Sequence, residues 1–157
     1  MITGIHHVAI SVPDLDKAVE FYHGTLGFKK IFANSWNGDR EEADQVIGLD
    51  RTSAKVQMLK AGNAYLELWE YIEPKPEEQK KDYSPADHGI AHIALQVTDI
   101  NDEFERLQTS GMTFHQQPVD LGNSSAIYGR DPFGNIIELY EVTGERSLKV
   151  VVNKLRP

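Results

Sequence analysis

Two histidines and two glutamates stand at matching positions of an internal sequence repeat. His7 opens the stretch HVAISVPDL and His92 opens its counterpart HIALQVTDI, while Glu67 lies in YLELWE and Glu138 in IELYE. Two neutral imidazoles and two carboxylates suit a borderline divalent cation such as zinc, nickel, cobalt, manganese or ferrous iron. If the two halves pair about a pseudo-twofold axis, these four side chains can converge on one ion. Four protein ligands in an octahedral arrangement leave two positions open for water or substrate, as catalytic metal sites do.

Other candidate ligands lack this symmetry. His6 lies on the opposite strand face from His7, and an alanine takes its place in the second copy, so we expect that His6 is not a ligand. Glu70 and Glu141 correspond to each other but face away from the two candidate glutamates, and we expect them to be solvated. The histidines without repeat counterparts are expected at the surface: His23, His88 and His115. Three aromatic residues on the face of Glu67 are expected either to line a pocket or to pack in the core: Tyr65, Trp69 and Tyr71.

Each copy of the repeat begins with a strand followed by a helix. Apolar and polar residues alternate with period two over residues 5–12, which predicts a half-buried strand. Asp14 is then the expected N-cap of a helix that ends at Gly27, with Leu15, Val19 and Tyr22 as its buried stripe. The second copy predicts the same elements: a strand over residues 91–97, Asp99 as the cap, a stripe of Ile100, Phe104 and Leu107, and an end at Gly111.

Three strands follow each helix, and the last one carries the candidate glutamate. They are expected at residues 29–33, 55–59 and 64–71 in the first copy, and at 113–116, 125–128 and 135–142 in the second. The first copy is longer, because Gly27 and Glu67 are 40 positions apart whereas Gly111 and Glu138 are 27 apart. The surplus of 13 residues lies around residues 34–54 and includes an amphipathic piece at 40–49. It is expected either to shape a substrate pocket or to form a plain surface excursion.

These elements predict an α+β protein built from two tandem βαβββ modules. The modules are expected at residues 1–72 and 89–143, joined by a proline-punctuated, charged linker at 73–88 and followed by a tail at 144–157. The tail carries Arg146, Lys149, Lys154 and Arg156 against Glu145, and we expect a strand or arm there rather than a nucleic-acid patch.

Composition excludes several functional classes. The formal net charge of -8 opposes binding to nucleic acid or to an anionic membrane surface. The absence of cysteine excludes disulfides, thiolate nucleophiles and zinc-thiolate sites, and it fits a reducing compartment. No secretory signal or stretch of membrane-spanning length is evident, so a cytoplasmic location is expected.

The chain resembles the vicinal oxygen chelate superfamily, which includes glyoxalase I, methylmalonyl-CoA epimerase, extradiol dioxygenases and bleomycin-resistance proteins. The resemblance covers residues 5–142 and rests on HVAI with the following VPDL, on FY and LGF in the first helix region, and on RDPFGN followed by IEL. It implies that the paired modules form an incomplete eight-stranded barrel around a metal ion, often within a homodimer. Bacterial glyoxalase I looks most similar in its ligands, which implies that His7, Glu67, His92 and Glu138 bind one divalent ion (zinc, nickel, cobalt or manganese).

The resemblance also implies a reaction. Glyoxalase I and the epimerase both remove a proton next to a carbonyl, so we expect an isomerase, epimerase or lyase acting on a small carbonyl or thioester substrate, with Glu138, and Glu67 beside it, moving the proton. Glyoxalase I carries an arginine where this chain has Ser11, which argues against a glutathione thiohemiacetal. Two alternatives stay open: a ring-cleaving dioxygenase of the extradiol type, and a non-catalytic small-molecule binding protein like those of antibiotic resistance.

Overall fold

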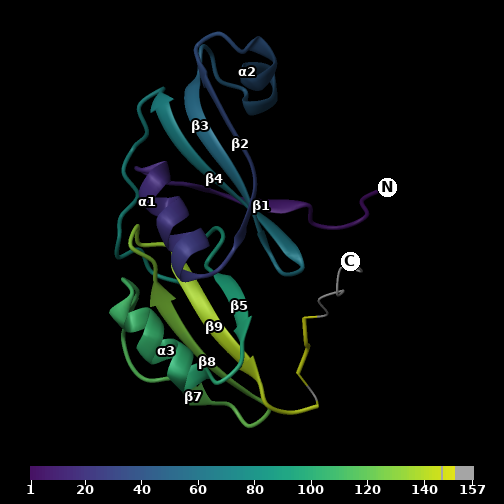
Figure 1. Ribbon diagram of the computed structural model, residues 1–157, viewed down its shortest axis with the longest axis vertical. Coiled ribbons are helices and arrows are strands. Elements are labelled where there is room, and N and C mark those ends of the chain that lie inside the picture. Colours follow the sequence, from purple (N-terminus) through teal and green to yellow (C-terminus); the bar gives the residue numbers. More distant parts are fainter. Residues whose placement is uncertain (146, 151–157) are drawn as a thin grey trace. The chain divides into compact units, whose positions relative to one another are not determined.

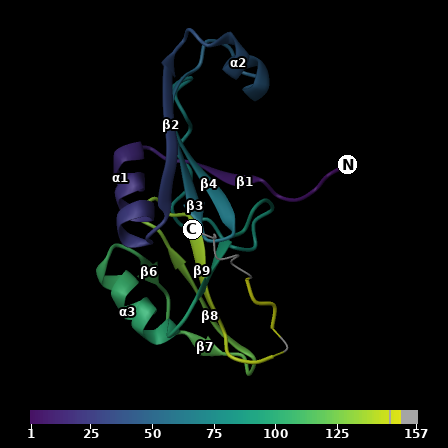
Figure 2. The same ribbon diagram turned by 45° about the vertical axis from the view of Figure 1, so that its right-hand side comes forward.

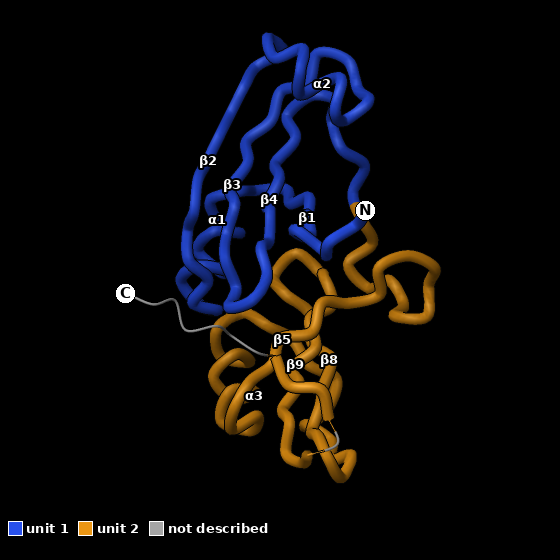
Figure 3. Tube along the Cα trace, turned by 90° about the vertical axis from the view of Figure 1, so that its right-hand side faces the viewer, with its two compact units in different colours: residues 1–78, 152–157 blue, residues 79–151 orange. Residues whose placement is uncertain are grey.

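The computed structural model describes residues 1–145 and 147–150 (Figure 1). Two compact units divide the chain, one comprising Met1–Glu78 and the other beginning at Gln79 (Figure 3). The expectation for the basic tail concerns Arg146, Lys154 and Arg156, which lie outside the described residues. No helix in the described part of the chain is long and apolar enough to cross a membrane.

The first unit is a four-stranded sheet with a helix on one face. Its strands lie in the order β1-β4-β3-β2, with β1 parallel to β4 and the other neighbours antiparallel. Its elements are β1 (His7–Ser11), α1 (Leu15–Val19), a π-helical continuation (Glu20–Thr25), β2 (Lys29–Asn37), α2 (Glu41–Ile47), β3 (Ser53–Ala61) and β4 (Ala64–Glu73).

The second unit repeats this plan. Its strands lie in the order β5-β9-β8-β6, with β5 parallel to β9 and a short strand β7 paired to β8. Its elements are β5 (Ile93–Val97), α3 (Ile100–Thr109), β6 (Thr113–Phe114), β7 (Val119–Asp120), β8 (Ser124–Arg130) and β9 (Ile136–Val142). The predicted α+β fold of two βαβββ modules is therefore confirmed, with β7 as an unexpected addition; neither sheet closes into a barrel.

Helices α1 and α3 each pack on one face of their sheet (Figures 1 and 2). The predicted stripe of α3 is confirmed, because Ile100, Phe104 and Leu107 are all buried. In the first unit the prediction was partly wrong. The helix widens into a π-helical turn after Val19, and the amide of Leu26 bonds the carbonyl of Phe21 five residues back. Leu15 and Tyr22 are buried as predicted, whereas Val19 is half-buried and Ala18 and Phe21 complete the buried stripe.

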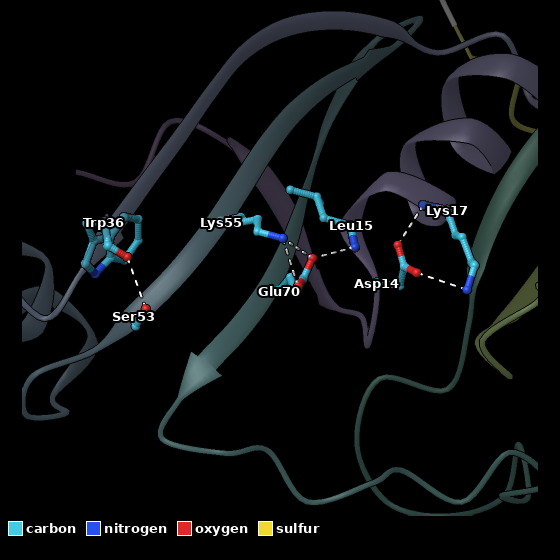
Figure 4. A network of polar contacts seen from close by, with 7 residues as sticks. All are labelled: Asp14, Leu15, Lys17, Trp36, Ser53, Lys55 and Glu70. Carbon is cyan, nitrogen blue, oxygen red and sulfur yellow. Dashed lines mark hydrogen bonds and ion pairs between the residues drawn. The ribbon is translucent and has the colours of Figure 1, made fainter.

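Glu70 and Glu141 are not simply solvated, as the sequence suggested, because each accepts hydrogen bonds from the start of a helix. Leu15 N donates to Glu70 Oε2 at 2.8 Å, and Lys55 Nζ lies 3.1 Å from Glu70 Oε1 (Figure 4). Asp99 N donates to Glu141 Oε1 at 2.6 Å. The amides of a helical first turn have no partner within the helix, and its positive dipole end favours an anion there. The sequence prediction considered exposure at a strand end but not the neighbouring helix.

The two predicted N-caps behave differently. Asp14 is confirmed, since its side chain accepts from Lys17 N at 3.0 Å and also lies 3.0 Å from Lys17 Nζ (Figure 4). Asp99 occupies the cap position but has a left-handed backbone, with φ of 53°, and its side chain makes no cap hydrogen bond. Glu141 supplies the acceptor instead.

The surplus residues of the first copy form an ordered extension of the sheet. β2 and β3 run on as an antiparallel pair from Asn34↔Val56 to Asn37↔Ser53, and the predicted amphipathic piece is helix α2. Asp44 ties α2 to the start of β3, because it accepts hydrogen bonds from Arg51 N, Thr52 N and the Thr52 hydroxyl. These bonds lower the pKa of the Asp44 carboxyl, the Thr52 hydroxyl being the main cause.

We expect that Glu70→Ala and Glu141→Ala each lower the free energy of unfolding by about 1–2 kcal/mol, because each leaves first-turn amides without their acceptor. Urea unfolding followed by circular dichroism measures this. Glu73→Ala is the matched control at the exposed end of β4 and should change stability by less than about 0.5 kcal/mol. Equal effects at Glu70 and Glu73 would contradict the capping role.

Candidate functional site

The first unit pairs His7 with Glu67. The parallel register sets His7 opposite Tyr65 and Ala9 opposite Glu67, so the two side chains project from the same face of neighbouring strands. His7 Nε2 lies 3.5 Å from Glu67 Oε2, and the side chains are 38% and 14% exposed. The other ring nitrogen of His7 lies 2.8 Å from His6 Nδ1. His6 therefore contacts the ring nitrogen of His7 that is not directed at Glu67.

The second unit builds the same pair from His92 and Glu138. His92 immediately precedes β5, and the register sets Ala94 opposite Glu138, as in the first unit. His92 Nε2 lies 3.1 Å from Glu138 Oε2. His92 Nδ1 is buried and has no hydrogen-bond partner among the described residues. The ring of Tyr128, whose residue faces Glu138 across the strands, lies 4.6 Å from the ring of His92.

Both pairs have the spacing of two ligands on one ion. Donors that each lie about 2.1 Å from a metal are about 3.0 Å apart at a right angle and about 3.4 Å apart at a tetrahedral angle. The separation of 3.1 Å in the second unit lies within this range, and the 3.5 Å of the first unit lies just above it. Without a metal, a proton between nitrogen and oxygen accounts for the same approach. Within either unit, the described residues gather no group of three histidine, aspartate or glutamate side chains that could hold an ion. Each unit thus offers two candidate ligands.

The two glutamates differ in their neighbours. Trp69 Nε1 donates to Glu67 Oε2 at 2.6 Å. Tyr140 stands at the position of Trp69 in the second repeat, and the described residues donate no hydrogen bond to Glu138 apart from the His92 contact. Glu67 is therefore held in place by a second donor, whereas Glu138 is freer to turn. The internal repeat alone did not reveal this asymmetry.

A tyrosine lies beside each glutamate and stays protonated. Burial, and secondarily the negative charge of Glu67, raises the pKa of Tyr71 above its ordinary value. Burial, and secondarily the charge of Glu138, raises the pKa of Tyr128. Near neutral pH both phenols can therefore donate a hydrogen bond to an acceptor on the site face.

An aromatic cluster borders Glu67. Trp69 stacks on Tyr71 with ring centroids 5.2 Å apart, and Trp36 meets Trp69 edge to face at 5.6 Å. A pocket of about 330 Å³ lies here, lined by Ala9, Ser11, Glu67, Trp69 and Tyr71. The prediction that Trp69 and Tyr71 line a pocket is thus confirmed, whereas the ring of Tyr65 stacks on His6 instead. The sequence pattern does not single out Trp36, although this residue lies in the surplus segment that was expected to form either a pocket or a surface excursion.

The second unit has a pocket of its own, of about 440 Å³. Arg130 lines it and donates to the carbonyls of Gly134 and Tyr83, with its guanidinium 5.0 Å from the Tyr83 ring centre. Gly129 must be glycine here, because a Cβ would lie 2.5 Å from Phe114. His115 also lines this pocket, although it is exposed as expected.

The remaining predicted surface histidines take no part in either pair. His23 contacts the carbonyl of Phe28 at 2.7 Å, near the end of the π-helical turn, and is exposed. His88 is exposed in the segment between the two sheets. Both predictions are confirmed.

Comparisons with known proteins agree with the fold. The profile of the Glyoxalase/Bleomycin resistance protein/Dioxygenase superfamily matches residues 4–139. A 2-epi-5-epi-valiolone epimerase from Actinomyces is 34% identical, over 86% of this chain and 77% of its own. A glyoxalase family protein from Bacillus cereus has a TM-score of 0.82 at 24% identity, covering 92% of this chain and 97% of that one. The fosfomycin resistance protein FosX from Listeria monocytogenes, solved with Mn(II) and sulfate, has a TM-score of 0.60 at 22% identity, covering 95% and 100%. The family resemblance found in the sequence is thereby confirmed.

The raised tyrosine pKa values predict a late step in a spectrophotometric titration. A phenol with a raised folded-state pKa contributes stability that is fully present below its unfolded pKa of about 10 and is lost as pH rises through the folded value. Tyr128→Phe should remove one phenol that ionises above the ordinary range. Glu138→Gln should lower the pKa of Tyr128, because it removes the neighbouring negative charge. An unchanged late step in Tyr128→Phe would contradict this assignment.

Proposed function

Because the chain belongs to the glyoxalase/bleomycin resistance protein/dioxygenase superfamily, we propose that it is a metal-dependent isomerase, epimerase or lyase that moves a proton next to a carbonyl. The repeated histidine–glutamate pair carries this proposal. Two independent strand pairs, β1–β4 and β5–β9, each hold one imidazole and one carboxylate at the separation expected of two ligands on one ion.

We assign the ligands to His7, Glu67, His92 and Glu138, one pair from a first unit and one from a second. Two imidazoles and two carboxylates suit zinc, nickel, cobalt or manganese, and the two negative charges balance a divalent ion. The buried Nδ1 of His92 has no partner among the described residues, so the contact of its Nε2 with Glu138 is the polar contact that orients this imidazole. The bound ion would supply Lewis-acid stabilisation of the negative charge that develops on the substrate's carbonyl oxygen.

Glu138 is the better candidate for the proton carrier. A base must turn between the substrate carbon and its resting contact, and Glu138 is held only by His92 among the described residues. Glu67 is fixed by the indole of Trp69, which suits a ligand that stays in place. Tyr128 lies across from Glu138 with its phenol protonated, so it can donate to a substrate oxygen near the same carboxylate.

The proposal also covers the oligomeric state, the compartment and the substrate class. We propose that the protein is a homodimer in the cytoplasm and that its substrate is a small carbonyl compound or thioester. β2 is an edge strand whose Ile31 and Phe32 are 49% and 52% exposed, and an exposed apolar edge favours pairing with another copy. The lack of cysteine fits a reducing compartment.

The proposal predicts bound metal and solvent exchange of a substrate proton. Elemental analysis of the purified protein should find about one divalent ion per pair of histidine–glutamate motifs, and His7→Ala and His92→Ala should each lower this content at least tenfold. Nuclear magnetic resonance in deuterium oxide should show exchange at the carbon next to the carbonyl. Glu138→Gln should slow exchange by about a hundredfold or more while the fold is retained. Glu77→Gln, in the exposed linker, is the control.

Two results would contradict this function. Exchange that survives in Glu138→Gln at the wild-type rate would remove Glu138 as the base. Full exchange in metal-free protein, confirmed by elemental analysis, would remove the ion from the reaction.

A further inference from the structure

The pocket beside Glu67 has an aromatic wall made of Trp69 and Tyr71, and Trp36 packs against Trp69 without lining the pocket itself. Trp36 Nε1 donates to the Thr52 hydroxyl at 2.9 Å, and Trp69 Nε1 donates to Glu67 at 2.6 Å. Both indole N–H groups are therefore satisfied within the protein, and these bonds set the tilt of the two rings. The stack of Trp69 on Tyr71 orients the third ring. A wall whose rings are already oriented loses little conformational entropy when a ligand lies against it.

The opposite side of this pocket is small and polar. Ala9 and Ser11 project from β1 on the face of Glu67, and neither carries a side chain large enough to fill the space. Ser11 and Tyr71 add two hydroxyls, and burial keeps the Tyr71 phenol protonated. The pocket therefore offers an apolar ring surface on one side and hydrogen-bonding groups on the other.

The charge of the pocket selects among substrate classes. Of the residues that line it, Glu67 is a carboxylate and none is lysine or arginine. A phosphate or free carboxylate would therefore meet no lysine or arginine side chain in this pocket. A neutral ring that carries hydroxyls fits better, because its C–H edges are attracted to the negative faces of the aromatic rings while its hydroxyls meet Ser11 and Tyr71.

This arrangement belongs to the first unit alone. The second repeat has Gln96, Tyr140 and Val142 at the positions of Ser11, Trp69 and Tyr71. Gln96 is bulkier than serine, and its Oε1 accepts from Val150 N at 2.7 Å. The added Trp36 comes from the insertion, which the second copy lacks. The two otherwise equivalent faces have thus diverged at the residues that would touch a ligand.

We propose that the Ala9–Ser11–Trp69–Tyr71 pocket is the substrate subsite and that it takes a neutral, hydroxylated ring ketone, held against the side chains of Trp69 and Tyr71. The assignment deepens the proposed function and rests on it, because it places the reacting ring beside Glu67 of the same site. The volume of about 330 Å³ accommodates a six-membered carbocycle with its hydroxyls. A coenzyme A thioester or a glutathione adduct would have to bind its anionic part elsewhere.

Binding can be measured apart from turnover. The chain has two tryptophans, and both lie in the cluster, so tryptophan emission reports on this pocket. The probes are a pentahydroxycyclohexanone, acyclic dihydroxyacetone and methylmalonyl-CoA, added to the full-length protein as purified. The ring ketone should shift or quench emission with saturation, and calorimetry should give it an affinity at least tenfold above that of dihydroxyacetone.

Variants test where the ring lies. Trp69→Ala should weaken ring-ketone binding about tenfold or more, while Trp69→Phe, which keeps an aromatic face, should stay within about threefold of wild type. Ser11→Arg, at an exposed position, should block the pocket and also weaken binding at least tenfold, so the test does not depend on the folding of Trp69→Ala. Val46→Ala is the control, since Val46 is an exposed apolar residue of the same unit outside the pocket.

The outcomes separate this inference from the proposed function. Saturable binding that is lost in Trp69→Ala and Ser11→Arg supports the subsite even if no proton exchanges, in which case the proposed reaction fails and the subsite stands. Failure of the ring ketone to bind, or wild-type affinity in Ser11→Arg, overturns the subsite. Proton exchange with methylmalonyl-CoA in a protein that does not bind the ring ketone also overturns it, while leaving the proposed reaction intact.

Discussion

The parallel pairing of the first and last strands of each unit is the constraint on which the site depends. β1 lies beside β4 and β5 beside β9, and both pairs have the same register relative to the histidine and the glutamate. In each last strand a second glutamate follows three residues later and therefore faces the other side of the sheet. Glu67 and Glu138 face the histidines, whereas Glu70 and Glu141 bond the first turns of the helices that cover the core. A register slip of one residue would turn each glutamate to the opposite face of its sheet, so that neither the histidine–glutamate pair nor the contact with the helix could form.

This two-sided use of one strand links stability to chemistry. The helix that Glu70 caps buries Leu15, Phe21 and Tyr22 against the back of the sheet, which keeps the strands in register for the pair on the front. Burial of large apolar side chains, at about 1.5–3 kcal/mol each, outweighs the local cost of holding a histidine and a carboxylate close together. The chain can therefore keep polar pairs on a half-exposed face without support from that face itself.

The two units share a scaffold but differ in the side chains around their equivalent glutamates. The first unit has the Trp36 cluster and the donor from Trp69 to Glu67, while the second has Arg130, which donates to the carbonyl of Tyr83 in the preceding segment. The equivalent glutamates consequently sit in unequal surroundings. Glu67 contacts both His7 and the indole of Trp69, whereas Glu138 contacts His92 without a counterpart of the indole donor among the described residues.

The sequence predicted the repeated elements well because period-two alternation and the α3 stripe are local patterns that packing reinforced. It failed where a distant element decided the outcome. The π-helical turn after Val19 was not predicted, and Glu70 and Glu141 were misjudged because their partners lie 55 and 42 residues away along the chain. The contact between Trp36 and Trp69 was not predicted, because no local sequence pattern around Trp36 indicates it. The pairing of β2 with β3 and of β3 with β4 brings the two rings together.

X-ray absorption spectroscopy of the cobalt- or zinc-loaded protein tests the central claim most directly, because it counts the imidazoles bound to the ion. The account predicts a first shell of nitrogen and oxygen at about 2.0–2.2 Å with outer-shell scattering from two imidazoles, falling to one in His7→Ala and in His92→Ala alike. A shell with a single imidazole in the wild-type protein, or one unchanged by either substitution, would contradict it.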